Sequence, residues 1–140
     1  MRDLSESRSH FLSTLARADA ARIKTAAEAL LPQLQPVEVV QSRSGLVMLP
    51  LRDTVKGCDF FMGEVLVAEA RIRARGAEGY GMVTGRDLAH AMAMALLDAA
   101  DAAGLPETAA FAADEAARHA AEDRATLCRI EATRVEMETF

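Results

Sequence analysis

The sequence predicts an α+β fold in a single domain over residues 1–140, with an antiparallel sheet of four to five strands packed by N-terminal helices and two alanine-rich helices. Residues 1–35 repeat apolar side chains at every third and fourth position, which predicts a pair of helices. Residues 37–84 mainly alternate with a period of two, which predicts strands. Residues 87–127 lose this alternation and predict two helices, and residues 131–140 regain it and predict a terminal strand.

Composition limits both the core and the class of partner. The chain has 140 residues, about one domain, and 51% of them are hydrophobic, but many are alanine and only 4% are aromatic. Since alanine buries little apolar area, the core gains less free energy per residue than one built from larger side chains. The net charge of −5 includes no dense cationic cluster, so we expect no nucleic-acid partner.

Two further features indicate the cellular compartment. No apolar run approaches the roughly 20 residues that span a bilayer, and the first residues lack the apolar core of a secretory signal. We therefore expect a cytoplasmic protein with no membrane partner. Cys58 and Cys128 belong to no CxxC motif, and in a reducing compartment we expect two free thiols.

The N-terminal segment predicts two packed helices. The first covers Leu4–Ala16, and Asp19 is a suitable N-cap for the second, which we expect to end at Pro32 and Pro36. A DNA-binding helix-turn-helix is the alternative. The second helix exposes only two cations, too few to read a groove, so a packing pair is preferred.

The next segment predicts a hairpin. Residues 37–42 alternate, Ser44-Gly45 has turn composition, and an apolar run, LVMLPL, follows. Because Pro50 cannot donate to a ladder, this second strand ends there, lies at an edge, or is bulged. A polar connection from Asp53 to Asp59 comes next.

A second strand pattern runs through VLVAEARIRARG, although its composition suits a helix. The alternation favours a strand over a helix, because Leu66 and Ile72 share one face with three alanines while the opposite face is charged. The charged face includes a row of three arginines, Arg71, Arg73 and Arg75. We interpret the row as a solvated face with carboxylates opposite. A docking strip for an acidic partner or a phosphate-rich ligand is the alternative.

The periodicity changes abruptly after the predicted strand at 79–84. Gly76 predicts the turn into this strand, and Asp87 predicts the N-cap of a helix that continues to Ala103. The few polar side chains of this helix fall within an arc of roughly 80°, so its remaining circumference is apolar. We expect such a helix to be covered on several sides, and a chain this short to need a partner to cover it.

The last helix is predicted from Pro106 to about Leu127, after a left-handed C-cap at Gly104. Its expected packing face consists of alanines, namely Ala109, Ala113, Ala116, Ala117 and Ala120. Arg124 projects onto the same side. Fraying of the helix before Arg124 is preferred over a buried guanidinium that pairs with a carboxylate or phosphate.

Catalytic motifs are sparse. The glycines before the helix form GxGxxxG, which is not the dinucleotide fingerprint. Gly85-Arg86-Asp87 precedes a helix N-terminus whose amides can hold an anion, although the carboxylate of Asp87 competes for them. His90 lies on the same polar strip and can pair with Asp87, either for acid–base chemistry or, the preferred interpretation, to satisfy two polar groups. We predict no catalytic, cofactor-binding or metal-ligating residue in this chain, and anion or partner contact at Gly85, Arg86, Asp87 and His90.

Four pieces of the sequence carry a family resemblance. In chain order they are RSHFLSTLARA, FFMGE, GYGMVTGRDLAHA and ATRVEMETF. They resemble the PhnG family, a small subunit of the bacterial carbon-phosphorus lyase machinery, in register over most of the chain. The matching positions include Phe11, Leu15, Gly45-Leu46-Val47, Phe61, Gly63, Gly85, Arg86, Asp87, His90, Ala91 and Thr133-Arg134-Val135. They transfer as packing, interface or ligand positions.

The resemblance implies a role in a complex. PhnG proteins assemble with PhnH, PhnI and PhnJ, and two copies of this chain are expected in the complex. The first step in that family couples an alkylphosphonate to MgATP as co-substrate, displaces adenine and leaves ribose 1-alkylphosphonate 5-triphosphate. PhnI chiefly performs this displacement, while PhnJ carries S-adenosylmethionine and an iron–sulfur cluster for the later cleavage. The chain is therefore expected to be an accessory transferase subunit that binds no cofactor and is inactive alone.

Two departures and two alternatives accompany this resemblance. The chain stops at Phe140, where relatives continue for several residues, and Ala109–Ala125 matches poorly, so nothing specific transfers at either place. The alternatives are a free-standing phosphonate- or nucleotide-binding module that uses the Gly85-Arg86-Asp87 helix start, and a catalytic subunit that uses Asp87 and His90.

Overall fold

The structure is a computed structural model that describes residues 4–136. Its elements are α1 (Leu4–Arg17), α2 (Ala20–Leu34), β1 (Val37–Arg52), β2 (Asp59–Ala74), β3 (Ala77–Thr84), α3 (Leu88–Ala102) and α4 (Pro106–Glu131). The strands form one antiparallel sheet in the order β1-β2-β3. The α+β class is confirmed, but the sheet has three strands instead of four to five.

The missing strands have two causes. The Ser44-Gly45 pair is not a turn, because Ser44 pairs with Ala68 and Gly45 with Val67 inside one continuous strand. A ladder with β2 along the whole of β1 outweighs local turn composition. The predicted terminal strand is also wrong for its described part, since α4 continues to Glu131 and residues 132–136 form no strand. Residues 137–140 of that prediction lie outside the described residues.

The strand β1 continues through Pro50 to Arg52. It lies at the edge of the sheet, and its register with β2 shifts between Leu49 and Pro50, so two of the three possibilities predicted for this proline hold together. The polar connection that follows is confirmed, with the carboxylate of Asp53 accepting the backbone N–H groups of Val55 and Lys56.

The two N-terminal helices are confirmed. The carboxylate of Asp19 caps α2 by accepting the backbone N–H of Arg22 at 3.0 Å. Only the stop at Pro32 is wrong, because this proline lies within the last turn and α2 ends at Leu34. The residue before Pro36 has the extended backbone (ψ 144°) that a following proline favours, so Pro36 marks the end of the helix.

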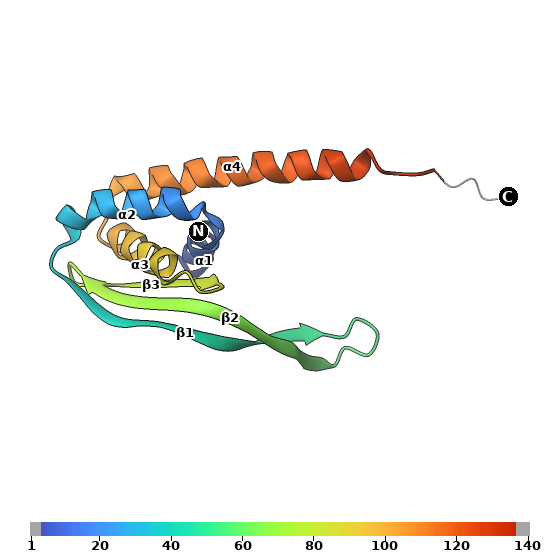
Figure 1. The fold of residues 1–140 in the computed structure, drawn as a ribbon, viewed down its shortest axis with the longest axis horizontal. Helices are drawn as coiled ribbons and strands as arrows, with labels where there is room; N and C mark the ends of the chain where they lie inside the picture. Colours follow the sequence, from blue (N-terminus) through green and yellow to red (C-terminus); the bar gives the residue numbers. More distant parts are fainter. Residues whose placement is uncertain (1–3, 137–140) are drawn as a thin grey trace.

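Helices cover one face of the sheet (Figure 1), with α3 against β3 and β2 and the other helices packed around α3. Two glycines of β3 allow α3 to come close. A Cβ atom on Gly79 would lie 2.0 Å from the carbonyl oxygen of Ala95, and one on Gly81 would lie 2.1 Å from that of Ala91. The backbone of α3 therefore rests directly on β3.

The helix α3 is predicted correctly in its limits, with Asp87 as N-cap and Gly104 in the left-handed region (φ 80°). The expectation that a partner must cover it is wrong. Ten of its residues are buried within this chain, and five of these are alanines. Small side chains let the sheet and the other three helices approach on all sides, so the chain shelters this helix with its own residues.

The last helix packs in the opposite orientation to the prediction. Four of the five alanines expected to pack are exposed, and the fifth, Ala116, is only partly buried. The buried residues of α4 are the polar Thr108 and Glu115. The helix also does not fray before Arg124, which is exposed on a continuous helix. Its second half extends beyond the other helices (Figure 1).

Candidate functional site

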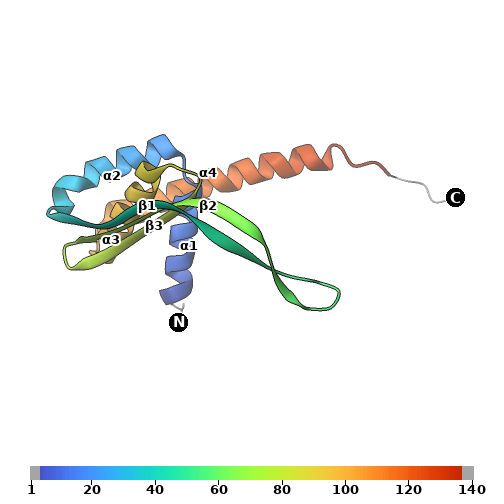
Figure 2. The ribbon, with the colours of Figure 1, turned by 60° about the horizontal axis from the view of Figure 1, so that its bottom comes forward.

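The ends of β1 and β2 form a two-stranded apolar arm that leaves the body of the molecule (Figure 2). We define the apolar arm as residues 46–52 of β1, residues 59–65 of β2 and the loop between them. Eight large apolar side chains on its strands are exposed: Leu46, Val47, Met48, Leu49, Leu51, Phe60, Phe61 and Met62. A contiguous exposed apolar patch of this kind is typical of a protein–protein interface.

Both faces of the apolar arm are apolar. The four exposed residues from Leu46 to Leu49 are consecutive, and successive side chains of a strand point to opposite faces. Elsewhere the sheet has one face on the core and one charged face. The change comes where β3 ends, since Thr84 pairs with Val67 and β3 does not extend along the arm. A two-stranded ribbon is marginally stable in water, which favours a partner around the arm.

At the predicted anion site, the start of helix α3 is already occupied by a side chain of this protein, Asp87. The carboxylate of Asp87 accepts the backbone N–H of His90 at 2.9 Å and the ammonium of Lys24 at 2.8 Å. The bond from Lys24, followed by that N–H, lowers the pKa of Asp87. Gly85 has φ 97° and turns the chain into the helix, and the side chain of Arg86 is exposed. The charge of Asp87 therefore lies where an anion would bind.

The ring of His90 does not form the acid–base pair. It is buried, and its Nε2 atom lies 3.0 Å from the carbonyl oxygen of Leu15 on α1. Asp87 contacts the backbone of His90 and the side chain of Lys24. His90 thus has a structural role, but its ring links α3 to α1 through Leu15 and not through the expected pairing with Asp87.

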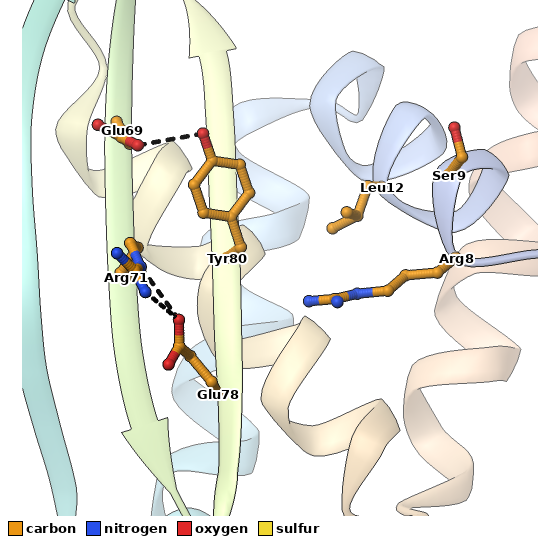
Figure 3. A pocket seen from close by; sticks show the side chains of 7 residues that line it. All are labelled: Arg8, Ser9, Leu12, Glu69, Arg71, Glu78 and Tyr80. Carbon is orange, nitrogen blue, oxygen red and sulfur yellow. Dashed lines mark hydrogen bonds and ion pairs between the residues drawn. The ribbon is translucent and has the colours of Figure 1, made fainter. Parts of the chain in front are cut away.

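A groove of about 680 Å³ lies between α1 and the charged face of the sheet (Figure 3). Its charged groups are paired with each other or with neighbours. Arg71 binds Glu78, the hydroxyl of Tyr80 donates to Glu69 at 3.2 Å, and Arg8 donates to Asp98 of α3 at 2.7 Å. The lining therefore presents balanced charge and favours no phosphate.

The predicted arginine row is largely the solvated face expected for it. Arg71 and Arg73 both face Glu78 on β3, and Arg73 also faces Glu38 on β1. Arg75 has left the strand and lies in the turn to β3, with φ 51°. The row therefore stabilises cross-strand pairing, and the docking-strip alternative gains no support from its geometry.

A buried carboxylate attaches α4 to the body. Glu115 has no exposed side-chain surface and accepts hydrogen bonds from Arg22 of α2 and from Arg118 one turn along α4. Burial raises the pKa of Glu115, but the bonds from Arg22 and Arg118 outweigh it and the net pKa is lowered. Further along, Arg17 of α1 binds Asp123. An ionic face therefore sets the direction in which α4 projects.

These contacts predict a loss of stability in acid. Glu115, Asp87, Glu78 and Asp123 all have pKa values lowered by their cationic or amide partners in the folded state. A lowered folded pKa contributes stability above the unfolded pKa that is lost as the pH falls through the folded value. We expect the free energy of unfolding, measured in urea, to fall from about pH 5 to about pH 3.

The variant Glu115→Gln tests the contribution of the buried carboxylate to this effect. It should lower the free energy of unfolding at pH 7 by about 1–2 kcal/mol, because the two arginines lose the carboxylate charge with which they pair, and flatten the acid dependence. Glu122→Gln is the control, since this exposed residue contacts only Arg118, at 3.8 Å, among the ion pairs of residues 4–136. Equal effects of the two substitutions would contradict the role assigned to Glu115.

Residues 4–136 contain no group of three or more His, Cys, Asp or Glu side chains placed to hold a metal ion. None of the helices there is long and apolar enough to cross a membrane. Cys58 and Cys128 are exposed free thiols, as predicted.

Sequence reasoning missed the apolar arm. It identified the apolar run before Pro50 and the FFM stretch, but it assigned the first to a separate hairpin and did not pair the two. The signal that was present is four consecutive apolar residues, Leu46 to Leu49, in a strand without a helix to cover both faces. The model of the family described as phosphonate metabolism protein PhnG matches residues 6–140 of this chain.

Proposed function

Because this chain belongs to the PhnG family of phosphonate metabolism proteins, we propose that it is the accessory subunit that supports PhnI when an alkylphosphonate displaces adenine from MgATP. The product is ribose 1-alkylphosphonate 5-triphosphate. PhnH and PhnJ complete the proposed complex, with S-adenosylmethionine and the iron–sulfur cluster on PhnJ. In this proposal the chain itself supplies a surface for assembly.

The apolar arm carries this proposal. Its eight exposed apolar side chains cover both faces of a ribbon that extends away from the body. Several positions on which the family resemblance depends, Leu46, Val47 and Phe61, lie in the arm. An arm of this composition gains free energy when a partner removes it from water, about 25 cal/mol for each Å² of apolar surface. The geometry thus favours obligate association through the arm.

The anion-binding alternative depends on the start of α3. There Asp87 already accepts an amide and pairs with Lys24, and its negative charge repels an incoming phosphonate. Thermal unfolding separates the two functions. A free-standing binding module is stabilised by ligand at a hundredfold its dissociation constant by about 2.7 kcal/mol, whereas an accessory subunit responds to PhnI instead.

Adenine release tests the accessory role directly. With ATP, Mg²⁺ and methylphosphonate, we expect no turnover from this chain alone and turnover when it is purified together with the PhnI-family subunit. Chromatographic detection of adenine gives the readout, and size exclusion shows whether the two chains elute together. Turnover by the lone chain, or two chains that elute separately at micromolar concentration, would contradict the proposed function.

A further inference from the structure

The sheet has a gap beside β2 in the apolar arm. β3 pairs with residues 67–74 of β2 only, and the chain then turns away at Gly85, whose N–H donates to the carbonyl oxygen of Leu66 at 2.8 Å. Among residues 4–136, no strand pairs with residues 59–65 of β2 on this side. The gap lies directly in line with β3, so a further strand there would continue the three-stranded sheet.

The direction of the backbone groups follows from the register. Because Gly85 bonds to Leu66, the N–H and C=O of Leu66 point toward the β3 side, and those of Glu64 do the same with the period of two. Leu46 and Met48 lie opposite Leu66 and Glu64, so their backbone groups point to the other side, the outer edge of β1. Each strand of the arm therefore has one free edge.

The two free edges differ in their capacity to add a strand. Pro50 occupies an outward position on β1, two residues after Met48, and has no N–H to donate. A proline at this position is a usual protection of an edge strand. The edge of β2 has no proline. The register of β2 with β1 shifts opposite Leu49 and Pro50, so the part of this edge that keeps regular strand geometry is centred on Glu64. The edge of β2 is thus the open one.

We propose that an extended, apolar segment of the partner subunit adds as a strand to the edge of β2 at Glu64, antiparallel to β2 and in line with β3. This inference rests on the proposed function, since it assumes an assembly with PhnI. Strand addition gives affinity through main-chain hydrogen bonds and specificity through alternate side chains. It converts a two-stranded ribbon into a three-stranded one and places apolar side chains against Phe60, Phe61 and Met62.

Paired proline substitutions at one register position test the proposal. Glu64→Pro removes the N–H that faces the gap, and Met48→Pro removes the N–H that faces the outer edge of β1, while neither removes a bond between β1 and β2. We expect Glu64→Pro to bind the PhnI-family subunit about 100-fold more weakly than Glu64→Val, and Met48→Pro to bind it within about fivefold of Met48→Ala. Thermal unfolding of each lone variant checks that the fold is retained.

Side-chain controls and hydrogen exchange complete the experiment. Glu64→Val and Met48→Ala keep both N–H groups, so each serves as the reference for the proline at its own position, and the Glu64 amide should exchange more slowly in the complex. Normal binding by Glu64→Pro, or an equal loss from both prolines, would overturn strand addition at β2 while leaving the proposed function intact. Failure of the unmodified chain to bind would instead overturn the proposed function.

Discussion

Replacing Gly81 with alanine is expected to lower the free energy of unfolding by about 3 kcal/mol or more, a change of roughly 10 °C in Tm. The added Cβ would lie 2.1 Å from the carbonyl oxygen of Ala91 and 2.7 Å from the Cβ of Met94. The first contact is to helix backbone, so α3 must move away from the sheet and open the core. Urea or thermal unfolding followed by circular dichroism measures the loss.

Gly45 provides the matched control. It is also a strand glycine, but a Cβ atom there would meet nothing within 4 Å, and its φ is ordinary. We expect Gly45→Ala to change the free energy of unfolding by no more than about 0.5 kcal/mol. If Gly81→Ala were as stable as the unmodified chain, the backbone contact between α3 and β3 would be refuted.

The second large effect concerns binding. Phe61→Ser should weaken association with the proposed PhnI-family partner at least about 30-fold, because an aromatic hot spot that the partner removes fully from water contributes about 2 kcal/mol or more. The stability of the lone chain should change little, since this side chain is 62% exposed. Isothermal titration calorimetry with each variant gives the dissociation constants.

Leu127 is the control for this substitution. It is equally apolar and equally exposed, at 64%, but it lies on the projecting half of α4. We expect Leu127→Ser to bind within about threefold of the unmodified chain. A larger loss from Leu127→Ser than from Phe61→Ser would move the principal contact from the apolar arm to α4.

Local chemistry made part of this fold predictable. Asp87 and Asp19 were identified as helix caps because a cap depends on residues within three positions, and both carboxylates accept the expected amides. The alternation from Leu66 to Ala74 likewise predicted which face of β2 is buried, because that pattern depends only on residues of one strand. These predictions needed no knowledge of distant segments.

The errors arose where distant residues decide the outcome. Ser44-Gly45 has turn composition, yet pairing with Ala68 and Val67 keeps it in a strand. The alanine face of α4 was expected to pack, but Arg22, from a segment nearly a hundred residues earlier, draws the carboxylate of Glu115 inward and turns the alanines outward. The apolar arm was missed for the same reason, because its two apolar stretches form one surface only after β1 and β2 pair.

Pro50 has a consequence for how this protein avoids aggregation. An exposed apolar ribbon with two unpaired strand edges can add further copies at both edges, so that the molecules assemble into a fibre. With a proline on the outer side of β1, growth has one permitted direction and stops after a single addition. The chain can therefore expose an apolar surface for its partner without forming open-ended polymers of itself.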